Sequence, residues 1–267
     1  MENQQPMDTN SHMKLYVRET GSPANSAIVF LHGSPLSGRM WLPQLERLTE
    51  FHCLAPDLPG HGQSASLPLT MQDIVQRLVK LIRESTPTGK THVVGLSFGG
   101  VVAQALMVAA PEVVDHVILS GTATRMSKVL VWISMLNEPL LRLLRPEQLA
   151  ALVCLQFGIP LQYRAMMGDD FKAFSSRTLS HVMRTYLEIE MPSATQSPTL
   201  VAVGQKETIY AKRAARTLSR SIPDAKGVMI PGCGHVWNLE APDLFVETVR
   251  AWVTDKPLPN RLMQLKL

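Results

Sequence analysis

The sequence has few cysteines and no long uninterrupted apolar segment. Its 267 residues include three cysteines, Cys53, Cys154 and Cys233, which cannot all pair and lack the spacing of metal ligands. Reduced thiols in a cytoplasmic protein are the simplest interpretation, and we expect no disulfide framework. The longest apolar run, residues 129–144, is interrupted by an Asn-Glu-Pro triplet and is too short to span a membrane.

A cluster of positive charge is also missing. The net charge is +4, but Lys and Arg are spread along the chain, whereas nucleic-acid-binding proteins usually gather them on one face. We therefore expect no nucleic-acid partner. Residues 1–12 lack the charged-then-apolar pattern of a secretion signal and are expected to form a disordered polar lead-in. No ligand cluster or dinucleotide-type glycine loop predicts a metal or an organic cofactor.

The chain does have enough apolar residues to bury one large core. Hydrophobic residues make up 45% of it, and α/β chains of this length commonly form a single domain. Apolar runs that end in turns predict strands, and they alternate with segments of helical periodicity. This alternation predicts an α/β fold, a mostly parallel sheet flanked by helices on both faces. The expected strands cover residues 13–17, 26–31, 53–56, 92–94, 116–120, 199–203 and 227–230.

The alternation stops between residues 124 and 196. Helical patterns over 129–135, 147–157 and 171–189 follow one another there without a strand, which predicts a helical cap inserted between the core segments 13–123 and 197–267. The cap is rich in methionine, which fills irregular apolar space. Its apolar residues therefore either line a substrate chamber or pack the cap's own core, and both interpretations stay open. The candidates are Trp132, Met135, Met166 and Met167.

Residues 91–100, THVVGLSFGG, carry the clearest chemical signal. A buried apolar run ends in Gly95, Ser97 and Gly99, and helical spacing follows, which is the pattern of a strand turning sharply into a helix with a serine at the apex. The two glycines fit because the strand and the helix approach too closely for side chains. The start of the helix aims free N–H groups, first that of Phe98, at whatever the serine attacks.

Several motifs together extend this signal over about residues 13–255. They are the oxyanion-loop sequence His32-Gly33-Ser34-Pro35, the rigid turn at 57–64, the serine turn at 95–99, and Gly234-His235 followed by Glu240-Ala241-Pro242. With these motifs the chain resembles the α/β-hydrolase superfamily, and specifically its capped esterase-like members. A serine at position 97 sets it apart from the branch that uses an aspartate nucleophile.

The resemblance implies a catalytic triad in the chain order Ser, acid, His. Ser97 and His235 match the family's nucleophile and base. The acid should follow the carboxyl end of a strand, and Glu207 is the carboxylate between them that meets this condition; the family more often has aspartate there. The Ser34 and Phe98 amides would form the oxyanion hole, and Trp237 would contact substrate. His32, Asp57 and His61 are expected to hold loops by hydrogen bonds.

These expectations describe a serine hydrolase that cleaves carboxylic esters of small or medium apolar acyl groups through an acyl-enzyme, with a small molecule as its partner. A lactonase or a C–C bond hydrolase of the same fold is the alternative, because one triad can serve each reaction. An alternative of another class is a ligand receptor that keeps the fold without turnover. The sequence makes no prediction of the oligomeric state.

Overall fold

The computed structural model describes residues 14–135 and 144–266, so the lead-in expected over residues 1–12 lies outside the described residues. Its centre is an eight-stranded sheet in the order β1-β3-β2-β4-β5-β6-β7-β8. Strands β2 to β7 run parallel, and β1 and β8 pair antiparallel at the two edges. The predicted fold class is confirmed. The strands are β1 (Val17–Thr20), β2 (Ala27–Leu31), β3 (His52–Pro56), β4 (Thr91–Leu96), β5 (Val114–Ser120), β6 (Thr199–Gly204), β7 (Lys226–Ile230) and β8 (Met263–Gln264).

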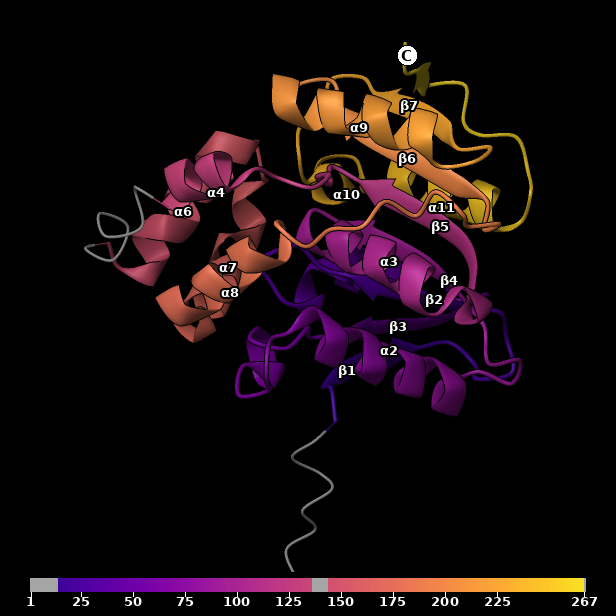
Figure 1. Ribbon diagram of the computed structural model, residues 1–267, viewed down its shortest axis with the longest axis horizontal. Coiled ribbons are helices and arrows are strands. Elements are labelled where there is room, and N and C mark those ends of the chain that lie inside the picture. The colour runs from indigo at the N-terminus through magenta and orange to yellow at the C-terminus, as the bar shows by residue number, and fades with distance from the viewer. Residues whose placement is uncertain (1–13, 136–143, 267) are drawn as a thin grey trace, which may run out of the picture.

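Helices cover both faces of this sheet, and the alternation of side chains along β2 shows why. Ile28 and Phe30 enter one buried cluster, with residues of α1 and α11, while Val29 and Leu31 enter the other, with residues of α2, α3 and α9. A strand buried on both faces needs an unbroken apolar sequence, as β2 has. Figure 1 shows α2, α3 and α9 lying along the same face of the sheet. These helices are α1 (Leu42–Leu45), α2 (Met71–Ser85), α3 (Phe98–Ala109), α9 (Ile209–Ser221), α10 (Trp237–Glu240) and α11 (Pro242–Val253).

Three local expectations need correction. The first strand begins at Val17 rather than at residue 13, because its partner β3 ends opposite at Pro56. The apolar spacing of residues 40–48 predicts one helix, but the structure has a 3₁₀ turn, Gly38–Trp41, followed by the short α1. A proline in the first turn of α1 cannot continue a preceding helix. The two-residue β8 was not predicted, since so short a strand has no periodicity.

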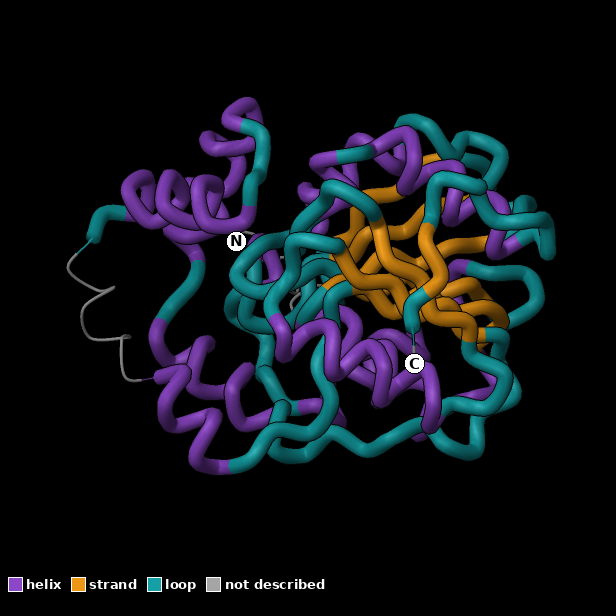
Figure 2. The backbone as a smooth tube through the Cα atoms, turned by 90° about the horizontal axis from the view of Figure 1, so that it is seen from above, coloured by secondary structure: helices purple, strands orange, loops and turns teal. Residues whose placement is uncertain are grey.

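In the described part of the chain between β5 and β6 lie four further helices, and we refer to residues 128–186 as the helical insertion. It comprises α4 (Lys128–Met135), α6 (Pro146–Phe157), α7 (Arg164–Ala173) and α8 (Ser176–Thr185). Figures 1 and 2 show these helices set to one side of the sheet. Among the helices of the described chain, none has the length and apolar character needed to cross a bilayer.

The single helical pattern expected over residues 171–189 is instead divided between α7 and α8. The division falls at Ser175, whose side chain accepts a hydrogen bond from the Thr178 N–H. A serine in extended conformation that caps free N–H groups starts a new helix. Periodicity alone did not reveal this break, because apolar residues occur on both sides of it.

A buried carboxylate fastens the helical insertion to the sheet domain. Asp170 of α7 accepts hydrogen bonds from the Ser37 N–H at 2.9 Å and from the Ser37 hydroxyl at 2.8 Å. Burial raises the pKa of Asp170 to about 6, although the bonds from Ser37 oppose that rise. The protonated form is therefore favoured in the folded protein more than in the unfolded chain.

We predict that Asp170→Asn removes a pH-dependent part of the stability. A carboxyl group whose pKa is raised from 3.8 to about 6 on folding adds stability at low pH that is lost as the pH rises through about 6. The melting temperature of the parent should therefore rise relative to that of Asp170→Asn between pH 7.5 and pH 5. Asp169→Asn is the control, because Asp169 is exposed and pairs with Lys172. Parallel curves for parent and Asp170→Asn would contradict the prediction.

Candidate active site

The serine turn joins β4 directly to α3. Ser97 has φ 56° and ψ −116°, a conformation that is strained for any residue with a side chain. Two hydrogen bonds hold it: the Ser97 N–H donates to the Ser120 carbonyl at 2.9 Å, and the Thr122 hydroxyl donates to the Ser97 carbonyl at 2.9 Å. Both partners belong to the end of β5 or the segment that follows it, so the neighbouring strand fixes the turn.

The glycines that flank this turn are required by close backbone contact. A Cβ atom at Gly95 would lie 2.5 Å from the Gly99 carbonyl oxygen, and one at Gly99 would lie 2.0 Å from the Leu31 carbonyl oxygen. Distances this short cannot be relieved by rotating a side chain, because the obstructing atoms are backbone. The contact predicted from the sequence is present, and it brings the first turn of α3 against the end of β2.

Glu207 and His235 meet beside this turn. Glu207 lies in the loop after β6 and His235 in the loop after β7, and their Oε2 and Nδ1 atoms are 3.0 Å apart. The Glu207 side chain is 4% exposed and that of His235 is 20% exposed. A proton on Nδ1 that is donated to the carboxylate leaves a lone pair on Nε2. The arrangement can therefore support an imidazole whose free nitrogen accepts a proton.

Gly121, the residue that follows β5, leaves the space that this pair needs. A Cβ atom there would lie 2.6 Å from Glu207 Oε1 and 2.9 Å from His235 Nδ1, and the residue has φ 52°. The Phe157 ring of α6 also lies near, with its centroid 5.3 Å from that of the imidazole ring. A residue from the sheet domain and a residue from the helical insertion thus both bound the imidazole.

A tyrosine at the end of the helical insertion lies near Ser97. Tyr186, the residue that follows α8, lines the same cavity as Ser97; burial raises the pKa of Tyr186 to about 12, and the nearby serine opposes that rise. Among the residues that the structure describes, no hydrogen bond joins the serine hydroxyl to His235. Such bonds are often long before substrate binds.

His61 connects the side chains of the two residues whose amides are expected to form an oxyanion hole. The His61 ring donates from Nδ1 to the Pro59 carbonyl at 3.0 Å and accepts the Ser34 hydroxyl at Nε2, also at 3.0 Å. Its ring stacks on Phe98 with 5.7 Å between centroids. Burial lowers the pKa of His61 to about 3, so the ring is neutral at pH 7. It contacts the side chains of both Ser34 and Phe98.

His32 and Asp57 bond to loop backbone, as expected. His32 Nε2 accepts the Leu58 N–H at 2.8 Å, while Nδ1 lies 3.1 Å from the Gly33 carbonyl oxygen, to which it donates. The buried Asp57 carboxylate accepts the N–H groups of Gly38 and Gln63, each at 2.8 Å, and also pairs with Arg18. These bonds join the loop at residues 32–38 to the rigid turn at 57–64.

The residues predicted to contact substrate lie in different environments. Met167 is buried in the core, with its sulfur 3.5 Å from that of Cys154. Trp237 packs against Phe245, and its indole N–H donates to the Ser120 hydroxyl at 2.8 Å. For these two side chains the structure corrects the prediction, because core packing accounts for them. Met166 is partly buried, Trp132 is 64% exposed, and the Met135 side chain lies outside what the structure describes.

A cavity of about 330 Å³ opens beside Ser97 and contains residues that the sequence analysis missed. Tyr186 of the helical insertion, Arg125 of the segment after β5, and Tyr210 and Arg213 of α9 line it. Within the described part of the chain, neither arginine forms an ion pair. No motif marks these residues, since they come from three separate segments and meet only in the folded chain.

Comparison with known proteins agrees with this architecture. The sequence profile of the Alpha/beta hydrolase family matches residues 28–248. An AB hydrolase superfamily protein of Gibberella zeae is 27% identical over 95% of this chain and 89% of its own length. A pimeloyl-[acyl-carrier protein] methyl ester esterase of Nitrosomonas europaea is 25% identical over 87% of this chain and 96% of its own.

The fold also matches a solved structure. A thermophilic esterase from Thermogutta terrifontis superimposes with a TM-score of 0.73 and 26% identity, covering 90% of this chain and 93% of that one. Three observations indicate the same family. They are the strand order, the serine turn between β4 and α3, and the family match over residues 28–248. The chain belongs to the alpha/beta hydrolase family.

Proposed function

We propose that the protein is a serine hydrolase that cleaves carboxylic esters of small or medium apolar acyl groups through an acyl-enzyme. The observation that carries this proposal is the 3.0 Å contact between Glu207 and His235, located beside a serine in a strained turn. A buried carboxylate on Nδ1 favours the tautomer that a general base needs and stabilises the imidazolium that forms. The similarity to esterases supports the same reaction class.

The reaction would proceed in two halves. His235 Nε2 takes the Ser97 hydroxyl proton as the serine oxygen attacks the ester carbonyl, and the same proton passes to the leaving alcohol when the C–O bond breaks. Water then attacks the acyl-enzyme and gives a proton to His235, which passes it to the Ser97 oxygen as the bond to the acyl carbon breaks and the acid leaves. The Ser34 and Phe98 amides would hold the oxyanion in both halves, each contributing about 3 kcal/mol.

Lactone hydrolysis and C–C bond cleavage remain alternatives on the same residues, because the substrate is selected by the cavity and not by the triad. A ligand receptor without turnover is the alternative of another class. Such a receptor would have no need to bury the Glu207 carboxylate against His235, since an ionised group out of water is costly unless it has a partner. The buried pair therefore favours an enzyme over a receptor.

A second candidate substrate class follows from the cavity beside Ser97. Arg125 and Arg213 line the same cavity as the serine, and guanidinium groups bind carboxylates in a planar, bidentate manner. Esters that carry a carboxylate on the acyl part, such as monoesters of dicarboxylic acids, would place that group near the arginines. Acidic esters are therefore the second candidate class beside apolar esters of the same length.

We predict that Ser97→Ala abolishes ester hydrolysis while the protein stays folded. Loss of the nucleophile in analogous enzymes lowers kcat by about 10⁴-fold or more. Hydrolysis of p-nitrophenyl butyrate and labelling by a fluorophosphonate probe would measure the loss, and the melting temperature would check the fold. Turnover within tenfold of the parent, or equal labelling of both proteins, would remove Ser97 from the proposal. A parent that is not labelled would favour the receptor.

Glu207→Gln should lower kcat by about 10²- to 10⁴-fold, because the amide can select the wrong tautomer of His235 and cannot stabilise the imidazolium. Glu207→Asp should keep a larger share of activity. Glu240→Gln is the matched control: its carboxylate lies near the site but accepts the Gly234 N–H at 3.0 Å instead of contacting the imidazole. Equal losses in the Glu207 and Glu240 amide variants would contradict the assignment.

The cavity predicts which ester is preferred. If the arginines bind a carboxylate, Arg213→Gln and Arg125→Gln should lower kcat/KM for monoethyl succinate by about 10- to 100-fold, the cost of a lost charged hydrogen bond. The kcat/KM for ethyl butyrate should change little. Arg220→Gln, on the same helix but outside the cavity lining, is the control. Equal effects on both esters would leave the apolar class as the better description.

A further inference from the structure

His61 is a buried imidazole near Ser97 that takes no part in the proposed proton transfers. It lies in the rigid turn after β3, and 1% of it is exposed. Its ring contacts Ser34 in the loop after β2, Phe98 at the start of α3 and Phe174 in the helical insertion. One side chain therefore touches three separate segments of the chain around the nucleophile.

The Ser34 N–H, one of the two amides expected to bind the oxyanion, lies beside the nucleophile. A Cβ atom added at Gly33, the preceding residue, would lie 3.2 Å from Ser97 Cβ. Within residues 14–135 and 144–266, the N–H groups of Ser34 and Phe98 donate to no other residue. Glycine leaves the Gly33–Ser34 peptide able to rotate. The direction of the Ser34 N–H therefore depends on what holds Ser34 itself.

The Ser34 side chain is held by a hydrogen bond whose direction is fixed. His61 Nδ1 lies 3.0 Å from the Pro59 carbonyl oxygen, which can only accept, so Nδ1 carries the ring proton. Burial lowers the pKa of His61 to about 3. Nε2 of the neutral ring therefore has a lone pair and accepts the Ser34 hydroxyl at 3.0 Å. This bond attaches Ser34 to the turn at residues 57–64.

That turn holds the imidazole in place through its backbone. The His61 N–H donates to the Leu58 carbonyl and the His61 carbonyl accepts the Ser64 N–H, each at 3.0 Å. The buried Asp57 carboxylate accepts the Gln63 N–H at 2.8 Å. The position of the ring is therefore set by bonds within the turn, and the ring can serve as a fixed point for the loop after β2.

The same ring packs against the residue that carries the second amide. The rings of His61 and Phe98 are stacked, with 5.7 Å between centroids and 30° between planes. Phe98 is fully buried and opens α3 directly after Ser97. The donors of an oxyanion hole must converge on one oxygen at about 3 Å. A ring that contacts both Ser34 and Phe98 holds one donor in place relative to the other.

We propose that His61 is a positioning residue of the oxyanion hole, which directs the Ser34 N–H toward the oxygen that develops negative charge. The inference rests on the proposed function, because the oxyanion forms only when Ser97 attacks a carbonyl group. His61 transfers no proton and acts through its bond to Ser34. Loss of that bond should therefore weaken binding of the transition state, lowering kcat while KM changes little.

Two substitutions break this bond from opposite ends. A neutral imidazole offers a donor on one nitrogen, an acceptor on the other and a flat ring, whereas phenylalanine has only the ring. His61→Phe should therefore keep the packing on Phe98 and lose the bond to Ser34. Ser34→Ala removes the hydroxyl and keeps the backbone amide.

Kinetics of His61→Phe and Ser34→Ala on p-nitrophenyl butyrate test the proposal. We expect each to lower kcat by about 10- to 100-fold, less than the loss of an oxyanion donor itself. A trifluoromethyl ketone, to which Ser97 adds to give a tetrahedral oxyanion, should bind each variant more weakly by the factor by which kcat falls. Because both substitutions break one bond, the double variant should lose little more than either single variant.

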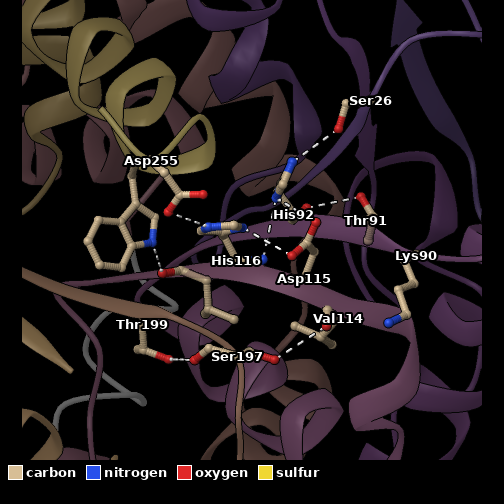
Figure 3. Close-up of polar contacts among 12 residues, drawn as sticks. Ser26, Lys90, Thr91, His92, Val114, Asp115, His116, Ser197, Thr199 and Asp255 are labelled. Atoms are coloured by element: carbon tan, nitrogen blue, oxygen red, sulfur yellow. Dashed lines mark hydrogen bonds and ion pairs between the residues drawn. The ribbon is translucent and has the colours of Figure 1, made fainter. Parts of the chain in front are cut away.

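His92 supplies the matched control at the opposite end of the sheet (Figure 3). It is a buried imidazole near the start of β4 whose Nε2 lies 3.1 Å from the Ser26 hydroxyl, and burial lowers its pKa to about 4. His92→Phe and Ser26→Ala therefore break a similar histidine–serine bond. We expect these controls to lower the melting temperature about as much as the test variants and to leave kcat unchanged.

Several results would overturn the proposal. They are an unchanged kcat in Ser34→Ala, additive losses in the double variant, and a fall in kcat that the affinity for the ketone does not follow. Ser34 is half-buried, so the Ser34→Ala test stands even where His61→Phe does not fold. The proposed function fails separately, when Ser97→Ala hydrolyses the ester as fast as the parent. The inference about His61 then fails with it.

Discussion

The close approach of three backbone segments around Ser97 is the constraint on which the rest of the structure depends. The end of β4 and the first turn of α3 come so near each other, and so near the end of β2, that no Cβ atom fits at Gly95 or Gly99. The serine is thereby held at a positive φ, which the chain accepts only because neighbouring bonds over-determine it. The start of α3, with its free N–H groups, is fixed at the same place.

The loops at the carboxyl ends of the strands are organised around this point. Buried neutral imidazoles do much of the bonding there: His32 joins the loop after β2 to the loop after β3, and His61 contacts both Ser34 and Phe98. Burial keeps these rings uncharged, so they serve as fixed donors and acceptors and not as acids. His235 differs because a carboxylate, Glu207, faces its Nδ1. Three histidines in one region thus have different chemistry because their partners differ.

The helical insertion also contacts the loops around Ser97. Phe157 lies against the His235 ring, Tyr186 lines the same cavity as Ser97, and Asp170 fastens α7 to Ser37 in the loop after β2. The region around Ser97 is therefore bounded by the insertion as well as by the sheet domain.

The sequence by itself determined the order of the elements and the central motif. Apolar runs predicted the strands β2 to β7, most clearly β2, which is buried on both faces and apolar throughout, and the glycine spacing predicted the turn at Ser97. Glu207 was found because it directly follows a predicted strand, and the structure brings its carboxylate to His235. These features depend on residues close together in the chain, whose constraints can be read locally.

Only the tertiary structure decided which side chains surround the nucleophile and which form the core. Trp237 and Met167 are residue types that often line substrate chambers, yet both are buried in the core. Burial depends on what packs against a residue and not on its type alone. Tyr186, Arg125 and Arg213 come from three segments and meet in one cavity. The bond between His61 and Ser34 joins the loops after β3 and β2. Contacts between distant segments leave no local pattern, because the fold alone brings them together.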